Sequence, residues 1–277
     1  MPEHLIFSSA SYIAAVGLGL FSIVFFLVRR KPVFRSMGLT FNRWLLIDLM
    51  VGLLITFGAI GLVFLVEWAL GSISVEPGSL TFSSFLRDVL APILTAAIIE
   101  ELLFRVLLLT GVAILLSRLK YGRWIAVVST AVVFGALHLG NDGATAVTAF
   151  GTGLGGLMYG IAFLATRSMW LPLGLHVGWN MSQGLLGFAI SGHQVPGWLT
   201  SISIGPEILN GGTYGPEGGI PGMLSRFLII ALIVLYVERR WPDGRLSDLN
   251  FAPGPEKKRR KKNRLGPTVQ GRRAAGK

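Results

Sequence analysis

Cysteine is absent from this 277-residue sequence, and charged residues are scarce. The lack of cysteine excludes disulfides and thiolate chemistry, so a catalytic nucleophile or base must come from another residue type. Charged residues make up only 14% of the chain, hydrophobic residues make up 52%, and the mean hydropathy is +0.64. A chain of this composition is too apolar for an ordinary soluble domain. The composition therefore indicates a protein that folds in a lipid bilayer.

Long uncharged runs fill the sequence between its two ends. A hydrocarbon core of about 30 Å needs about 20 apolar residues for each helical crossing. The sequence predicts an all-α, multi-pass transmembrane helix bundle with about seven spans, or eight if the third run divides. That run is too long for one straight crossing, so we expect a break near Gly111 and a partly interfacial remainder. The expected spans are Leu5–Val28, Trp44–Leu70, Phe85–Leu116, Trp124–Leu139, Ala144–Thr166, Leu171–Ile190 and Gly222–Val237.

Lysine and arginine gather at one end of these spans, with Arg87 as an exception, and this distribution sets the expected topology. The segment 191–221 contains neither lysine nor arginine. Because positively charged loops stay in the cytoplasm, we expect the N-terminus outside, the C-terminus in the cytoplasm and residues 191–221 as an external loop. The expected location is the plasma membrane of a bacterium or an archaeon.

The C-terminal segment 239–277 carries most of the net charge of +11, with 13 Lys and Arg against 3 Asp and Glu. Its mixture of proline, glycine and charge cannot bury a core, so we predict a disordered cytoplasmic tail. Two roles stay open for it: attachment to anionic lipid headgroups, and a topology signal that keeps the C-terminus inside. We expect no nucleic-acid partner, because the charge lacks aromatic interleaving and a binding fold.

Three glycines, Gly151, Gly153 and Gly156, spell the GxGxxG pattern of dinucleotide-binding loops. That function requires a preceding strand, whereas the surrounding run Ala144–Ala165 is apolar and long enough to cross a bilayer. Small residues at four-residue spacing let membrane helices approach closely. We therefore interpret these glycines as helix-packing positions.

Three ionisable residues stand inside the third apolar run, within Glu100-Glu101-Leu-Leu-Phe-Arg105. One charge at the bilayer centre costs about 2.5 to 3.5 kcal/mol on insertion scales, so three indicate a function. Glu101 and Arg105 are spaced i,i+4 on one helix face, where they can form an ion pair. Glu100 is rotated by about 100° from Glu101, so it needs a partner on another helix.

Two of the four histidines, His138 and His176, fall inside predicted spans. His176 and Asn180 are again spaced i,i+4, so an imidazole and a carboxamide project from one helix face. His4 and His193 lie in predicted loops, and we expect no specific role for them. The sequence thus offers Glu100, His138, His176 and Asn180, from three helices, as one candidate site.

These four residues suit peptide hydrolysis by an activated water. A carboxylate in a low-dielectric pocket becomes a competent general base near neutral pH, so Glu100 is the candidate water activator. His138 can orient or share that water, directly or through a metal. His176 and Asn180 can donate hydrogen bonds to the oxyanion of a tetrahedral intermediate.

The motifs EExxxR (100–105), FxxxH (134–138) and HxxxN (176–180) occur in this order. This conjunction resembles the CPBP (Abi) family of intramembrane proteases, which includes the type II CAAX prenyl endopeptidases. The resemblance covers about residues 85–190. It implies that Glu100 and His138 activate water, that His176 and Asn180 stabilise the oxyanion, and that Glu101 and Arg105 support them.

The resemblance leaves a metal cofactor open, because the family has been described both as metal-dependent and as metal-independent. If one divalent ion such as zinc binds, Glu100, His138 and His176 are its expected ligands. The HExxH spacing is missing and Asn180 is a weak ligand, so we favour a metal-independent water mechanism. The implied substrate is a membrane-associated protein or peptide, CAAX-like or otherwise, cleaved beside the bilayer.

The expected organisation has five parts. Residues 1–84 form N-terminal transmembrane helices, 85–190 the catalytic core in the membrane, 191–221 the external loop, 222–238 the last span, and 239–277 the tail. Three alternatives stay open: a transporter or channel, a catalytically silent membrane scaffold or immunity protein, and a polar network that only fixes helix packing.

One geometric difficulty accompanies the catalytic hypothesis. Glu100 and His138 lie about 15 residues from the basic turns, whereas His176 lies within about 10 residues of Arg167. Straight helices of 1.5 Å rise per residue would separate them. We expect the break near Gly111, or an extended segment over Ser168–Pro172, to bring them together.

Overall fold

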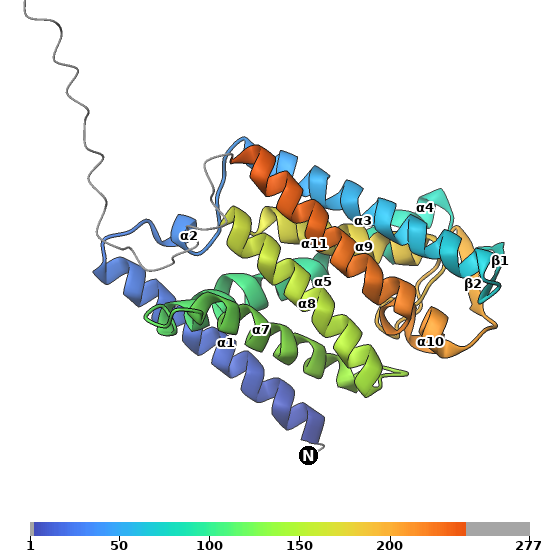
Figure 1. The fold of residues 1–277 in the computed structure, drawn as a ribbon, viewed down its shortest axis with the longest axis horizontal. Helices are drawn as coiled ribbons and strands as arrows, with labels where there is room; N and C mark the ends of the chain where they lie inside the picture. Colours follow the sequence, from blue (N-terminus) through green and yellow to red (C-terminus); the bar gives the residue numbers. More distant parts are fainter. Residues whose placement is uncertain (1–2, 242–277) are drawn as a thin grey trace, which may run out of the picture.

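The structure, a computed structural model, describes residues 3–241, and these residues form a bundle of helices with one short β-ribbon (Figure 1). The all-α multi-pass class is therefore confirmed. Within the described residues, five helices are long and apolar enough to cross a membrane, and this finding supports an integral membrane protein. These helices are α1 (Glu3–Val28), α3 (Trp44–Ala69), α7 (Gly122–Leu137), α8 (Ala146–Thr166) and α11 (Ile220–Arg240).

The remaining two predicted spans take other forms, so a count of seven stays a prediction. The run that was expected to span 171–190 is a shorter helix, α9 (Trp170–Leu185), buried among its neighbours. The run 85–116 is one helical stretch that extends from Phe82 to Leu115. Its parts are α4 (Phe82–Phe85), the π-helix η1 (Leu86–Leu90), α5 (Ala91–Glu101), the π-helix η2 (Leu102–Leu109) and α6 (Thr110–Leu115).

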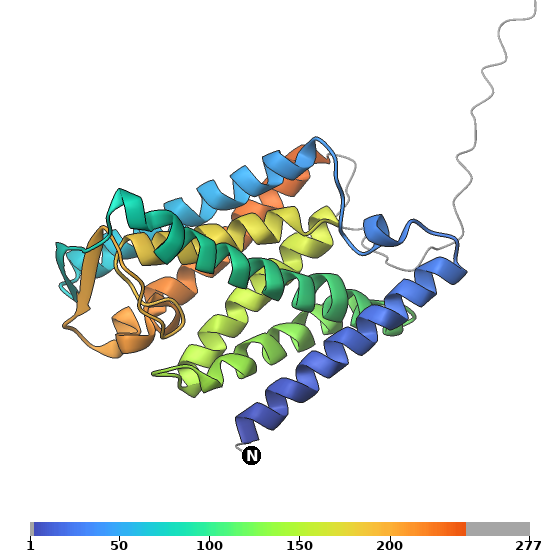
Figure 2. The ribbon, with the colours of Figure 1, turned by 180° about the vertical axis from the view of Figure 1, so that it is seen from behind.

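The predicted break near Gly111 is wrong. Backbone dihedrals stay right-handed helical through the junctions at Leu102 and Thr110, and the stretch ends only at Leu116. Figure 2 shows this stretch crossing the bundle from teal to green. Gly111 serves packing instead, because a Cβ there would lie 2.6 Å from the Cβ of Leu18 on α1. A small residue inside a membrane helix can mark a close contact as readily as a break.

The expected extended segment over Ser168–Pro172 is also wrong. Helix α8 ends at Thr166 and is capped by Arg167, which adopts a left-handed conformation with φ of 54°, and α9 begins at Trp170. Pro172 lies in the first turn of α9, where the missing N–H costs no intrahelical hydrogen bond. The chain therefore reverses in a tight turn and not in an extended segment.

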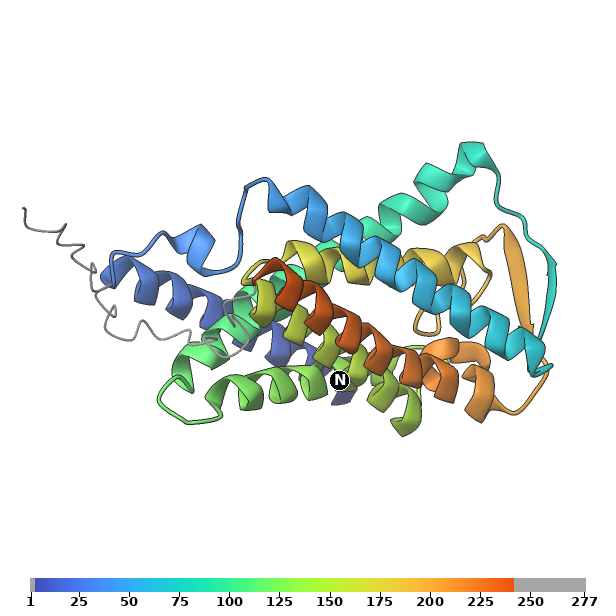
Figure 3. The ribbon, with the colours of Figure 1, turned by 45° about the horizontal axis from the view of Figure 1, so that its top comes forward.

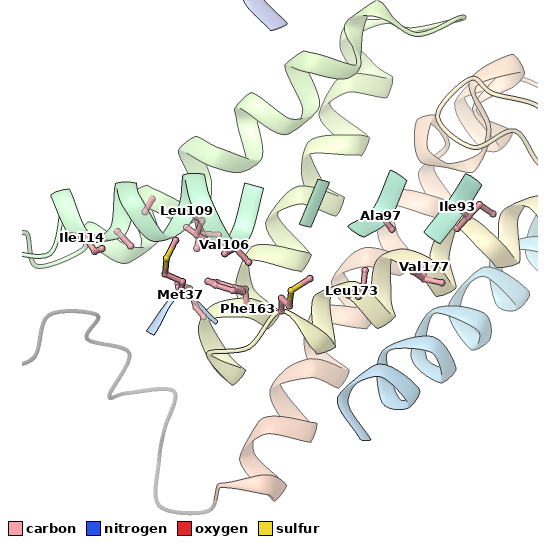
Figure 4. Packing of buried hydrophobic residues seen from close by; sticks show 14 of the residues in the cluster. Met37, Ile93, Ala97, Val106, Leu109, Ile114, Phe163, Leu173 and Val177 are labelled. Carbon is pink, nitrogen blue, oxygen red and sulfur yellow. The ribbon is translucent and has the colours of Figure 1, made fainter. Parts of the chain in front are cut away.

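The expected separation of His176 from Glu100 and His138 is removed by the position of the α8–α9 turn. Phe163 and Leu173, on either side of that turn, pack in one core cluster with Val106 and Leu109 (Figure 4). The turn is therefore level with the middle of the Phe82–Leu115 stretch and not with its end. Six residues of α9 then suffice to bring His176 level with Glu100.

Close helix crossings hold the bundle around α9. A Cβ on Gly174 or Gly178 of α9 would meet α3 at 2.3 Å or 2.2 Å respectively. The GxGxxG glycines of α8 also pack: Gly156 lies against Phe134 of α7. These contacts confirm the helix-packing interpretation, because absent side chains let the backbones approach.

The segment 191–221 is built from short elements. Strands β1 (Ile73–Pro77) and β2 (Leu199–Ser203) pair antiparallel, with Ile73 opposite Ser203. This ribbon joins the end of α3 to the segment after α9, at the opposite end of the molecule from α2 (Val33–Ser36) (Figure 3). The segment 191–221 also contains α10 (Glu207–Asn210), η4 (Gly212–Tyr214) and η5 (Pro216–Gly218). A further 3₁₀ turn, η3 (His138–Gly140), follows directly after α7. The predicted tail from residue 242 onward lies outside the described residues.

Candidate active site

Glu101 and Arg105 form the ion pair that their spacing predicts. Nε of Arg105 lies 3.3 Å from Oε2 of Glu101, and the two side chains are 3% and 0% exposed. Arg105 also donates to the carbonyl oxygen of Gly156 at 3.1 Å. Its guanidinium lies over the rings of Phe134 and Tyr159 at 4.8 Å and 5.1 Å. Buried charge is tolerated here because the arginine is surrounded by an acid, a carbonyl oxygen and aromatic faces.

Glu101 has a second partner that spacing did not predict, the imidazole of His176. Nδ1 of His176 lies 2.9 Å from Oε1 of Glu101. Since a carboxylate only accepts, Nδ1 carries the proton, and Nε2 is left for the other side of the ring. Glu101 therefore fixes the tautomer and the orientation of His176, as a carboxylate partner commonly does for a working histidine.

Glu100 lies on the opposite side of the same imidazole. Its Oε2 is 3.8 Å from Nε2 of His176, and its side chain is 30% exposed, in contrast to the fully buried Glu101. Glu100 Oε2 is itself buried without a hydrogen-bond partner in the described structure. The two adjacent carboxylates thus lie on opposite sides of His176. Glu101 is hydrogen-bonded to Nδ1, whereas Glu100 lies 3.8 Å from Nε2. The partner on another helix that was predicted for Glu100 is therefore His176, which Glu101 also contacts.

The plane of the His176 ring is held by aromatic contact. Tyr159 of α8 stacks on it, with ring centroids 4.7 Å apart and an interplanar angle of 17°. Phe134 of α7 meets the same ring edge-on at 6.3 Å. With Glu101 at Nδ1, these rings leave His176 little freedom to rotate. A site pre-organised in this way needs no rearrangement when charge develops beside it.

His138 closes helix α7 and turns its ring into the same region. Its Nδ1 lies 2.7 Å from the carbonyl oxygen of Phe134, one turn earlier. Because a carbonyl oxygen only accepts, Nδ1 is the protonated nitrogen, and Nε2 of the neutral ring is an acceptor. No ion pair joins His138 to Glu100 in the region that the structure describes. Both residues line the same cavity.

One cavity of about 430 Å³ collects all four predicted site residues. Glu100, His138, His176 and Asn180 line it, while Glu101 lies behind His176. The structure therefore brings together side chains from α5, the end of α7 and α9. Other polar residues in the lining are Tyr12, Asn141, Thr152, Tyr159, Ser191, His193, Glu217 and Arg226.

A second buried ion pair, Glu217 with Arg226, was missed from the sequence. Arg226 Nη2 lies 3.4 Å from Glu217 Oε1, and the side chains are 2% and 5% exposed. Ser191 and Trp179 donate to the same carboxylate at 2.6 Å and 3.2 Å. The available signal was an arginine inside the last apolar span. Glu217 gave no signal, because an acid in a loop is usually solvated.

His193, for which the sequence indicated no specific role, lines the same cavity. Its placement follows from the packing of segment 191–221 over the end of α9. His193 N donates to the carbonyl oxygen of Ile190, and Asn141 donates its Nδ2–H to that of Ser191 at 2.8 Å. Sequence alone gives no reason for a loop to fold back onto a membrane cavity.

A metal site does not emerge from the described residues. No group of three or more His, Asp or Glu side chains among them converges as metal ligands. His176 is hydrogen-bonded through Nδ1 to Glu101, and His138 through Nδ1 to a backbone carbonyl. The preference for a metal-independent water stays a prediction.

Comparison with known proteins agrees with this geometry. Residues 82–182 match the family model described as "Type II CAAX prenyl endopeptidase Rce1-like". This match spans the Phe82–Leu115 stretch, α7, α8 and most of α9. It therefore includes the four predicted site residues and the Glu101–Arg105 pair. No curated protein and no solved structure matches the chain. Residues 82–182 are therefore similar to the type II CAAX prenyl endopeptidases, in agreement with the resemblance that the three motifs indicated.

Proposed function

We propose that this protein is an intramembrane endopeptidase that hydrolyses a peptide bond in a membrane-proximal substrate, using a water activated by Glu100 and His138. The observation that supports this most is the meeting of Glu100, His138, His176 and Asn180 around one cavity. His138 and His176 are each held by a hydrogen bond through Nδ1, whereas Glu100 Oε2 has no hydrogen-bond partner in the described structure. A packing network would instead satisfy each polar group with a neighbouring one.

The attacking water lies between two acceptors in this proposal. Glu100 Oε2 is buried without a hydrogen-bond partner, so it can accept a proton from water. His138 donates through Nδ1 to Phe134, so its Nε2 offers a second acceptor that orients the same water. One proton passes to Glu100 as the water oxygen bonds to the substrate carbonyl carbon.

The oxyanion that forms needs hydrogen-bond donors on its other side. Asn180, one turn after His176 on α9, supplies an amide N–H. His176 uses its Nδ1–H for Glu101, so it donates from Nε2 only when that nitrogen is also protonated. Glu101 stabilises the resulting imidazolium, because the carboxylate is fixed 2.9 Å from the ring. Each oxyanion donor of this kind is commonly worth about 3 to 4 kcal/mol.

Collapse of the tetrahedral intermediate completes the reaction. The carbon–nitrogen bond breaks, and the proton held by Glu100 passes to the departing amine. The products are one peptide with a new carboxylate and one with a new amine. This route forms no covalent acyl-enzyme, because the attacking group is a water and not a side chain. The serine and threonine hydroxyls in the lining, on Ser191 and Thr152, are hydrogen-bonded to Glu217 and Tyr214.

Cleavage by the purified full-length protein tests the proposal. The probes are a quenched fluorescent peptide that ends in a farnesylated CAAX sequence and its unprenylated counterpart. We expect the wild type to cleave at least one, and Glu100→Gln and His138→Ala to lower turnover by about 10² to 10⁴. Glu76→Gln, an exposed acid on β1, is the matched control and should keep full activity.

Two outcomes would contradict the proposal. Wild-type turnover by a folded Glu100→Gln protein would show that another group activates the water. Absence of cleavage of both peptides by a folded wild type would favour a membrane scaffold over an enzyme of this specificity.

A further inference from the structure

A second cavity, of about 550 Å³, lies where the ends of α1, α3, α8 and α11 meet. It shares no residue with the catalytic cavity. Helices α8 and α11 line both cavities, but with opposite ends: Gly155 and Arg226 face the first, Thr166 and Arg240 the second. The second cavity is therefore a separate feature of the other end of the bundle.

Five cations line this cavity and no acid does. They come from three separate places in the chain: the segment after α1, the α8–α9 turn and the end of α11. Within the described residues, Arg29, Lys31 and Arg35 form no ion pair. The five cations are Arg29, Lys31, Arg35, Arg167 and Arg240.

Arg240 is the most firmly placed of these cations. Its side chain is 6% exposed and is paired with Asp48 through Nη1. The guanidinium lies between Trp44 and Trp241, 4.0 Å from each ring. Its Nε is nevertheless buried without a hydrogen-bond partner in the structure. A buried guanidinium with an unused N–H, in a cavity of like charge, calls for an anion.

The walls of the cavity are built by specific long-range contacts. Thr40 donates to Ser168 Oγ at 3.0 Å, and the indole of Trp170 donates to the carbonyl oxygen of Thr40 at 2.5 Å. Met169 N donates to the carbonyl oxygen of Gly38 at 3.0 Å. The segment that carries α2 is thereby fixed against the α8–α9 turn, beside the end of α11 (Figure 1).

Backbone strain accompanies this arrangement. Arg30 and Arg167 adopt left-handed conformations, with φ of 52° and 54°. Glycine takes this conformation at less cost than arginine, and such outliers concentrate at functional sites. A helix commonly ends with glycine at such a left-handed position. At the end of α8 this position is occupied by Arg167, whose cation lies in the cavity lining.

We propose that this cavity binds the phosphate group of an anionic phospholipid in the leaflet that faces it. Arginine and lysine from several directions suit phosphate oxygens, and basic pockets between membrane helices recognise lipid headgroups. The apolar part of the lining is aromatic, with Phe25, Phe26 and Phe163 beside the two tryptophans. That composition fits a lipid, whose headgroup and acyl chains need both kinds of surface.

A simple topology signal explains less of what the structure shows. Positive charge near the span ends is enough to hold a loop in the cytoplasm. That role requires neither a cavity, nor contacts that fix the loop, nor a buried arginine with an unused N–H. It also predicts that basic residues in any cytoplasmic turn are interchangeable, and this is what the experiment tests.

The experiment measures lipid binding to the full-length protein by native mass spectrometry in a neutral detergent. The ligands are phosphatidylglycerol, phosphatidylcholine with the same acyl chains, and inorganic phosphate. The test variant is Lys31→Gln with Arg35→Gln. The matched control is Arg118→Gln with Lys120→Gln, exposed cations of another turn that lie outside the cavity. Both variants keep the segment 242–277, so its own charge cancels from the comparison.

We expect the wild type to bind one phosphatidylglycerol at least tenfold more tightly than phosphatidylcholine, and the test variant to lose that preference while the control keeps it. Equal loss in both variants would overturn the proposal in favour of diffuse surface charge. Binding of inorganic phosphate as tight as that of phosphatidylglycerol would overturn the lipid assignment and point to a soluble phosphate ligand. Unchanged phosphatidylglycerol binding in the test variant would overturn it as well.

Discussion

Replacing Glu100 and Glu101 separately by glutamine separates catalysis from stability at two adjacent positions. Glu101 is fully buried, pairs with Arg105 at 3.3 Å and holds His176 at 2.9 Å. Glu100 is 30% exposed and comes no closer to His176 than 3.8 Å. The two variants remove one carboxylate charge each, from very different surroundings.

The Glu101→Gln variant leaves Arg105, itself 3% exposed, without a counter-charge. Breaking a buried ion pair by removing one partner commonly costs about 3 to 5 kcal/mol. For a chain of this size, each kcal/mol lowers the melting temperature by about 2 to 4 °C, so we expect a fall of about 10 °C. Any protein that folds should also lose activity, because a neutral glutamine does not stabilise the positive charge that His176 carries when it donates to the oxyanion.

The Glu100→Gln variant should behave in the opposite way. No hydrogen bond to a described residue is lost, so we expect a melting temperature within about 2 °C of the wild type. Turnover should fall by about 10² to 10⁴, equivalent to about 3 to 5.5 kcal/mol of barrier, because the general base is gone.

The assay measures melting temperature and cleavage rate on the same purified preparations, with Glu76→Gln as the control. Wild-type cleavage by Glu100→Gln would refute the assignment of the base. A Glu101→Gln protein that is as stable as the wild type but inactive would refute the division of labour between the two acids.

Three further predictions concern other parts of the chain. Glu217→Gln should lower the melting temperature by a similar amount to Glu101→Gln, because Arg226 is then buried without its acid; an unchanged melting curve would contradict this. Cysteines introduced at Ser201 and Thr268 should differ toward an impermeant thiol reagent on intact cells, with labelling at the first only; labelling at the second alone would reverse the topology. Chelation of divalent metals should leave activity unchanged, and elemental analysis showing stoichiometric zinc whose removal abolishes and whose return restores cleavage would refute a metal-independent water.

Local spacing predicted the parts of the site that depend on one helix. Glu101 and Arg105 needed only the i,i+4 rule, and the structure forms that pair. The four cavity residues could be chosen because ionisable and polar groups in apolar spans are costly enough to be conspicuous. Catalytic roles remain predictions at all four.

Contacts between distant segments could not be predicted in the same way. The bond between His176 and Glu101 joins residues 75 positions apart, and the choice between Glu100 and Glu101 depends on the angle at which α5 and α9 cross. The unbroken helix through Gly111 was mispredicted because a packing glycine and a breaking glycine look alike in sequence. Glu67 shows a further limit: it is fully buried in α3, and its surroundings contain no hydrogen-bond partner for either carboxylate oxygen in the structure.

The π-helix η2 makes the length of this part of the chain as important as its composition. It begins directly after Glu101 and contains Arg105, so the acids and the arginine sit on either side of a junction between two helical geometries. A wider turn accommodates more residues per revolution than an α-helix. Removal of one residue between Leu102 and Leu109 would change the rotation of the part before the deletion relative to the part after it, because each residue contributes a turn about the helix axis. The single-residue deletion would therefore disturb how the two carboxylates are aimed at His176, although Glu100, Glu101 and His176 all remain in the chain.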